Sequence, residues 1–228
     1  LELMAKAFYL CELTEKFAVE DAPAFGVYRM LIDGLSLLES TAAPDLMIHW
    51  YEMLNCGFRL PATGACDYPA CRKLGESRTY VHGDRELDIE GWIRGMAAGR
   101  SFFTTGPMVL LEVDGRRPGE QIRFGDTGSQ SRRVTARVRV RSEVAPVTNV
   151  QLIVNGHIVN RLQVPAQQVK GAWLEFERSI QLTRSGWIAA RAYSTSRLGT
   201  PDAEAHTNPV YVYLNGKAPY DRDSLDSL

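Results

Sequence analysis

The strongest constraint on the fold is a change of hydrophobic periodicity about 100 residues into the chain. From Thr104 onward, apolar and polar residues alternate. Val109, Leu111 and Val113 alternate with their neighbours before the turn Asp114-Gly115, and the run RVTARVRVRS repeats the pattern. Because successive side chains of a strand point to opposite faces, both segments predict strands with one solvated face.

Further strands are predicted downstream. The segments NVQLIVNGHIVNRLQV and NPVYVYLNGK each contain an Asn-Gly pair, and the first pair has the apolar flanks of a type I′ hairpin. With WLEFERSI and GWIAARAY, about seven short strands fall between residues 107 and 214. This number and spacing predict an all-β, sandwich-like domain over residues 107–228.

The first half of the chain has a different pattern, in which helices alternate with short apolar blocks. The predicted elements are a helix over residues 3–17, a strand in IDGLSLLES, a helix from Pro44 to Leu54, a strand in FRLPATGACD, and a helix from Asp88 to Met96. Alternating strands and helices are typical of α/β proteins. We therefore predict an α/β unit over residues 1–106.

Composition excludes several classes of function. The 26 basic residues nearly cancel the 27 acidic ones, so no broad basic surface for nucleic acid is predicted. The chain has no apolar stretch near the roughly 20 residues that a membrane span needs. The four cysteines form no CxxC pair, which argues against a zinc ribbon or a redox motif.

Two carboxylates are candidate site residues because each follows an apolar block. Asp67 comes just after LPATGA, where an α/β barrel presents its catalytic groups, and could bind a divalent metal. An Asp that caps the turn before Pro69 is the alternative, and the pattern leaves both open. Glu39 ends the preceding block, where it is either a base or ligand near the site or a solvated loop carboxylate.

Basic side chains follow Asp67 closely. A guanidinium of Arg72 or Arg78 could bind a phosphate or carboxylate through two hydrogen bonds, and exposed salt bridging is the alternative. The chain has only four histidines, none at HxH or HxxxH spacing. A metal site made of histidines from this chain alone is therefore not predicted.

Aromatic residues of the second half suggest a different class of function. Tyr211 and Tyr213 share one face of the last predicted strand, and with Trp173 they could form a platform for a sugar or pack in the core. The arginines at positions 137, 139 and 141 predict a charged outer face.

One long segment resembles a known family. It reads HWYEMLNCGFRLPATGACDYPACRKLGESRTYVHGDRELDIEGWIRGMAAGRSFFTTGPMVLLEVDGRRPGE. It is similar to the CehA/McbA-like branch of the PHP (polymerase and histidinol phosphatase) domain proteins. In that branch, a WYxxLNCGFRLPA stretch leads into a Gly-Ser/Thr-Asp motif, and GRSFxTxGP leads into a β-rich C-terminal domain. The resemblance covers roughly residues 25–220.

The resemblance implies a fold and an activity. The family fold is a β/α barrel with a metal cluster at its strand ends, so residues 1–106 are expected to be the C-terminal part of such a barrel. Its members hydrolyse carbamates or esters, and a phosphoester is also expected as a small-molecule substrate. Asp67 falls on the metal-binding Asp, and we predict Glu39, Arg72 and Arg78 as catalytic residues near it. Zinc, manganese or iron would suit such a site.

Two departures from the family pattern limit this interpretation. Pro69 stands where the family often has His, and the HxH of the earlier barrel strands is not in this chain. We therefore expect a C-terminal fragment of a metal-dependent hydrolase that lacks its N-terminal barrel segment, is inactive alone and need not hold a metal. The alternative is a non-catalytic β-sandwich module that binds a glycan or a protein partner.

Overall fold

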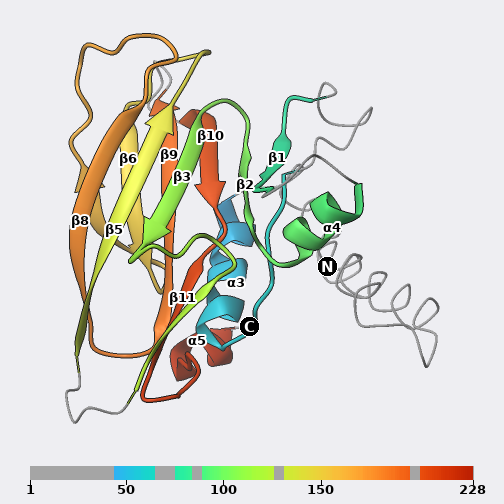
Figure 1. Cartoon of the computed structure of the whole chain (residues 1–228), viewed down its shortest axis with the longest axis vertical. Coiled ribbons are helices and arrows are strands. Elements are labelled where there is room, and N and C mark those ends of the chain that lie inside the picture. Colours follow the sequence, from blue (N-terminus) through green and yellow to red (C-terminus); the bar gives the residue numbers. More distant parts are fainter. Residues whose placement is uncertain (1–43, 65–74, 84–88, 126–130, 196–200, 228) are drawn as a thin grey trace.

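The computed structural model describes residues 44–64, 75–83, 89–125, 131–195 and 201–227. Within these ranges the chain forms eleven strands and three helices (Figure 1). The helices are α3 (Pro44–Asn55), α4 (Ile89–Ala97) and α5 (Arg222–Ser227). None of them is long and apolar enough to cross a membrane.

The strands form two sheets, one large and one small. The large sheet has the order β1-β2-β10-β9-β11-β4, with β6 pairing with β9 and β7 pairing with β6. Its strands are β1 (Arg78–Val81), β2 (Ser101–Thr104), β4 (Gln121–Phe124), β6 (Asn149–Val154), β7 (His157–Leu162), β9 (Gly186–Thr195), β10 (Pro201–Thr207) and β11 (Val210–Leu214). The small sheet has the order β3-β5-β8, with β3 (Met108–Val113), β5 (Arg132–Arg141) and β8 (Leu174–Leu182).

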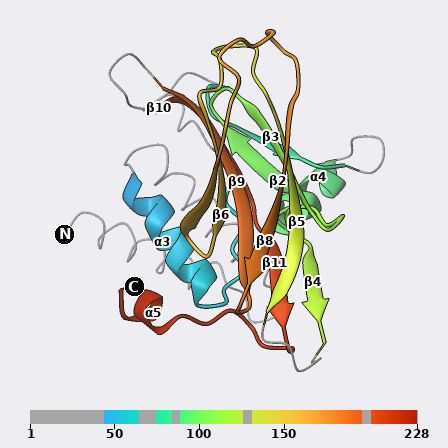
Figure 2. The same ribbon diagram turned by 90° about the vertical axis from the view of Figure 1, so that its left-hand side faces the viewer.

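The small sheet packs on one face of the large sheet (Figures 1 and 2). Its inward side chains are those at alternate positions of β3 and β5, including Val109, Leu111 and Val138, all of which are buried. They meet Leu152 of β6 and Ile188 of β9 in one apolar core. Period-two alternation places these side chains on a common face, so the pattern directly produces this core.

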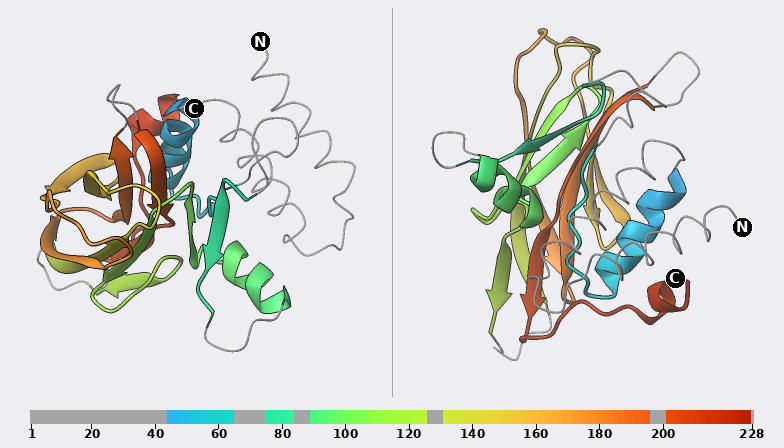
Figure 3. Two further views of the ribbon diagram at one scale, coloured as in Figure 1. Left: turned by 90° about the horizontal axis from the view of Figure 1, so that it is seen from above. Right: turned by 90° about the vertical axis from the view of Figure 1, so that its right-hand side faces the viewer.

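Helix α3 covers the opposite face of the large sheet (Figure 3). Trp50 and Leu54 lie one turn apart on α3 and pack against Trp187 of β9 and Phe103 of β2. The large sheet is therefore covered on both faces, and all five residues of β11 are buried. Burial on both faces explains why β9 and β11 read as nearly continuous apolar runs.

The predicted β/α barrel is wrong. Among the described residues, only β4 and β11 pair in parallel, and every other strand pairing is antiparallel. A β/α barrel needs parallel strands that each lead into an outer helix. Here β1 and β2 instead extend a mostly antiparallel sheet, and α3 packs on one face of that sheet. Strand pairing also crosses the predicted boundary at residues 106 and 107, because β2 pairs with β10.

Several predicted elements are confirmed. α3 ends at Asn55, and Gly57 follows with a φ of 89°. Helix α4 ends before Gly99, whose φ is 69°. Asn155 and Gly156 join β6 to β7 with φ values of 49° and 82°, as a type I′ turn requires. The β-rich character of the second half is confirmed as well.

The predicted strand in FRLPATGACD is not found where the structure describes it, because residues 58–64 have no regular secondary structure. The helix predicted over residues 3–17 and the strand predicted in IDGLSLLES lie outside the described residues.

Candidate functional site

The predicted site residues are only partly covered by the structure. Glu39, Asp67 and Arg72 lie outside the described residues. Arg78 is the first residue of β1 and is exposed, with its guanidinium carbon 6.0 Å from the centre of the Tyr80 ring. The arrangement of Asp67 with the arginines therefore stays a prediction.

The segment that leads to Asp67 is fixed to the large sheet by one buried amide. Asn208 lies between β10 and β11 and is fully buried. Its Oδ1 accepts a hydrogen bond from the backbone N–H of Ala62 at 2.8 Å, and its Nδ2 donates to the carbonyl of Ala62 at 2.8 Å. The same Nδ2 donates to Ser101 Oγ at 2.8 Å. At Ala62, one side chain thus supplies the two hydrogen bonds that a neighbouring strand would otherwise provide.

Two further contacts fix the segment before Ala62. Trp50 of α3 donates from its indole Nε1 to the carbonyl of Leu60 at 2.8 Å. Arg59 donates to the carbonyl of Gly119 at 2.9 Å, and its guanidinium lies 4.4 Å from the centre of the Tyr211 ring. The segment is therefore held from the helix side and from the sheet side.

Gly64 and Thr79 fix the two ends of the segment that contains Asp67. Thr79 Oγ1 accepts a hydrogen bond from the N–H of Gly64 at 2.9 Å and lies 3.2 Å from the Gly64 carbonyl, to which it can donate. A Cβ at Gly64 would lie 2.7 Å from Ser77 Oγ and 3.0 Å from Cβ of Phe103. Glycine therefore permits a close approach of the outgoing chain and β1.

The variant Thr79→Val tests this connection. Valine keeps the branched shape but removes both hydrogen bonds to Gly64, so we expect a loss of about 1–2 kcal/mol in the free energy of unfolding. Thr135→Val is the matched control, because Thr135 is an exposed threonine of β5. Urea denaturation of both variants measures the difference. Equal losses in the two variants would contradict the assigned role of Thr79.

His206 occupies the centre of an aromatic cluster between α3 and the large sheet. Its ring stacks on Phe103 at 5.6 Å between centroids and meets Trp50 edge-on at 5.4 Å. Its Nδ1 lies 2.7 Å from the carbonyl of Thr207, so this nitrogen donates. Its Nε2 lies 2.5 Å from the hydroxyl of Tyr51 and is therefore the acceptor of that O–H.

Burial keeps His206 neutral. The pKa of His206 falls from 6.5 to about 3. Burial is the main cause, the Thr207 hydrogen bond opposes it by favouring the charged form, and the nearby Arg191 guanidinium adds to the lowering. Both ring nitrogens already have partners. The arrangement is therefore that of a core histidine, which orders Tyr51 of α3 against β10.

The other three histidines are on or near the surface. His49 contacts Glu52 at 2.9 Å within α3, His82 contacts Arg117, and His157 is exposed on β7. Within the part of the chain that the structure describes, no three His, Cys, Asp or Glu side chains come together as a metal site requires. The described residues alone thus do not fit a divalent metal, and any such centre would need residues outside them.

The aromatic residues considered for glycan binding do not form an exposed platform. Tyr211 and Tyr213 are buried against α3 and under Arg59 and Arg123. Trp173 is half-buried, with the guanidinium of Arg139 at 4.7 Å from its ring centre.

The arginine row forms the predicted charged outer face of the small sheet. Arg137 contacts Glu177 at 3.0 Å and Arg139 contacts Glu175 at 2.8 Å, both across the β5–β8 pairing. Hydrogen bonding to Glu177 is the main reason that the pKa of Arg137 is raised. These arginines are therefore engaged in a cross-strand ion-pair ladder.

Sequence reasoning missed Thr79, His206 and Asn208. The one available signal was the polar run His-Thr-Asn at 206–208 just before the apolar run VYVYL, because polar residues next to a buried strand need buried partners. Neither the known protein-family models nor the curated proteins gave a match to this chain.

Proposed function

We propose that this chain forms the C-terminal part of a metal-dependent hydrolase, with Asp67 as a metal ligand. The substrate class is a small ester, carbamate or phosphoester. The proposal rests on the resemblance of residues 49–120 to the CehA/McbA-like proteins. The observation that favours it most is the anchoring of residues 58–64 and β1 on both sides of Asp67.

The described residues serve as positioning residues in this proposal. Asn208, Trp50 and Arg59 hold the chain before Gly64, and Thr79 joins Gly64 to β1. A segment whose ends are held by a packed core loses less entropy when its side chains bind a ligand. A divalent metal in such a hydrolase supplies an activated water.

The experiment that tests this function is an activity measurement on the protein expressed from its complete reading frame. Its probes are 4-nitrophenyl acetate, a 4-nitrophenyl carbamate and 4-nitrophenyl phosphate. We expect hydrolysis of at least one probe and, in Asp67→Ala, a fall in kcat/KM of more than about 100-fold, because losing a ligand exceeds the usual effect of losing a residue that supports one.

The matched control is Asp223→Ala, which removes an exposed carboxylate of α5. We expect this variant to retain the wild-type rate. Hydrolysis that survives in Asp67→Ala at the level of Asp223→Ala would overturn the proposal, as would the absence of hydrolysis of all three probes.

A further inference from the structure

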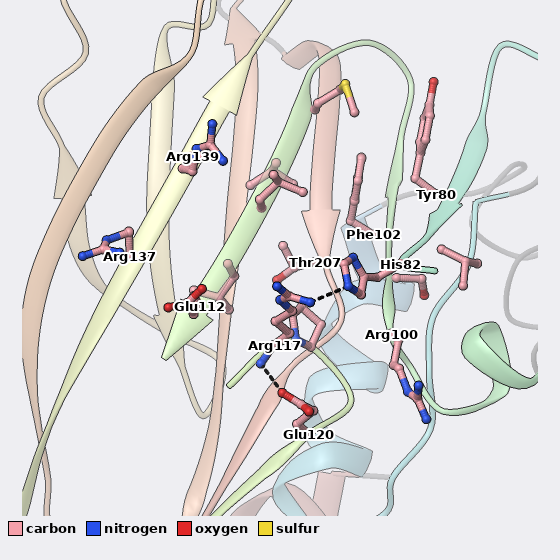
Figure 4. A pocket seen from close by; sticks show the side chains of 17 residues that line it. Tyr80, His82, Arg100, Phe102, Glu112, Arg117, Glu120, Arg137, Arg139 and Thr207 are labelled. Carbon is pink, nitrogen blue, oxygen red and sulfur yellow. Dashed lines mark hydrogen bonds between the residues drawn. The ribbon is translucent and has the colours of Figure 1, made fainter. Parts of the chain in front are cut away.

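A cavity of about 480 Å³ lies between the β1–β2 pair and the outer face of β3 (Figure 4). Tyr80 and Phe102 line it from the large sheet, and Met108 and Leu110 line it from the small sheet. Alternation along β1 places Tyr80 on the face opposite to Thr79. The cavity is therefore separate from the anchored segment that leads to Asp67.

One wall of the cavity is apolar and flat. The rings of Tyr80 and Phe102 stack at 5.0 Å with an interplanar angle of 6°, and Tyr80 is 38% exposed. Met108 and Leu110 are half-buried outer residues of β3, whereas the neighbouring strand β5 presents arginines on the same face. An aromatic ring bound here would add to an existing stack and cover apolar surface.

Basic side chains also line the cavity. Arg117 Nη1 and His82 Nε2 are in direct contact, with both side chains at the cavity (Figure 4). Arg100, Arg137 and Arg139 also line it, against the two carboxylates Glu112 and Glu120. Arg137 and Arg139 already pair with carboxylates of β8. Arg117, whose guanidinium contacts His82 and, among the described residues, not a carboxylate, is therefore the arginine best placed to meet an incoming anion.

The turn that carries Arg117 is fixed at several points. Glu120 Oε2 accepts a hydrogen bond from the backbone N–H of Arg117 at 2.7 Å, and the backbone N–H of Gly119 donates to the Pro209 carbonyl at 2.9 Å. Gly119 has a φ of 83°, and a Cβ there would lie 2.2 Å from the Ala98 carbonyl oxygen. The backbone from which the Arg117 side chain extends is therefore fixed, and only the side chain has to be ordered when an anion binds.

We propose that this cavity binds an aromatic carboxylate. The ring lies against Tyr80 and Leu110, and the carboxylate accepts paired hydrogen bonds from the Arg117 guanidinium, replacing His82 as its partner. The cavity volume is within the range of small-molecule sites. Binding here is independent of the proposed hydrolase chemistry, because it uses neither Asp67 nor a metal.

Isothermal titration calorimetry of the full chain with 2-naphthoate and its neutral analogue 2-naphthamide tests the proposal. We expect 2-naphthoate to bind at least about 10-fold more tightly, because one charge-assisted hydrogen bond is worth that much. Arg117→Gln is expected to lower the affinity for 2-naphthoate to that for the amide, and Leu110→Ser to weaken both ligands.

Arg133→Gln is the control, because Arg133 is an exposed arginine of β5 that does not line the cavity. We expect it to leave both affinities unchanged. Equal affinities for the acid and the amide, an equal loss in Arg117→Gln and Arg133→Gln, or no binding of 2-naphthoate at about 1 mM would each overturn the proposal.

Discussion

Lowering the pH from 7 to 4 is expected to reduce the free energy of unfolding by on the order of 3 kcal/mol through His206 alone. In the folded chain, burial holds the pKa of His206 near 3, below its ordinary value of 6.5. Below pH 6.5 the unfolded chain therefore binds a proton that the folded chain does not. The contribution of neutral His206 to the free energy of unfolding is fully present above pH 6.5. It falls as the pH is lowered, until the pH reaches about 3.

The variant His206→Gln isolates this contribution. Glutamine can still bond to Tyr51 but does not ionise, so we expect a lower stability at pH 7 and a much flatter dependence on pH. Urea denaturation at several pH values between 7 and 4 measures both quantities. His157→Gln replaces an exposed histidine of β7 and serves as control. A wild-type slope that persists in His206→Gln would show that other groups cause the acid lability.

The variant Asn208→Ala is expected to lower the free energy of unfolding by on the order of 3 kcal/mol, because it leaves several buried polar groups without a partner. These groups are the N–H and carbonyl of Ala62 and the hydroxyl of Ser101. Because Asn208 holds residues 58–64 on the sheet, the Ala62 amide should also lose most of its protection from hydrogen exchange.

The control for this variant is Asn149→Ala. The side chain of Asn149 bonds to Thr148 and Thr195 at the surface, so its loss should change stability by less than about 0.5 kcal/mol. Unchanged exchange at Ala62 in Asn208→Ala would mean that the segment is held by Trp50 and Arg59 without Asn208.

The strands of the second half could be predicted because their patterns are local. In β5, four apolar residues at alternate positions face the core, and the Asn155-Gly156 pair accommodates the positive φ values of the hairpin. Both signals come from the backbone geometry of neighbouring residues. They need no knowledge of distant partners.

The architecture of the first half could not be predicted in the same way. The apolar stripe of α3 indicates that one face is buried, but the partners that bury it, Trp187 and Phe103, lie far along the chain. An alternating helix and strand pattern is equally compatible with a barrel and with one helix on an antiparallel sheet. Long-range pairing, here between β2 and β10, decides between them.

For the candidate site, the sequence predicted which residues could carry the chemistry but not which residues hold them in place. The resemblance of the segment around Asp67 to a known family suggested metal chemistry. The residues that hold the chain on either side of Asp67 are, by contrast, single polar side chains that lie far apart in the sequence. Thr79 has no local pattern that distinguishes it from a surface residue, and the polar run at 206–208 does not identify the partners of Asn208. Their roles depend on backbone groups that lack a ladder partner, which only the three-dimensional arrangement reveals.

The most direct test of the proposed function is the metal content of the protein from the complete reading frame, measured by inductively coupled plasma mass spectrometry. Wild type, Asp67→Ala and Asp223→Ala would be compared after dialysis against metal-free buffer. We predict stoichiometric zinc, manganese or iron in wild type and Asp223→Ala, and its loss in Asp67→Ala. A protein without metal, or with the same metal content in all three forms, would contradict the account.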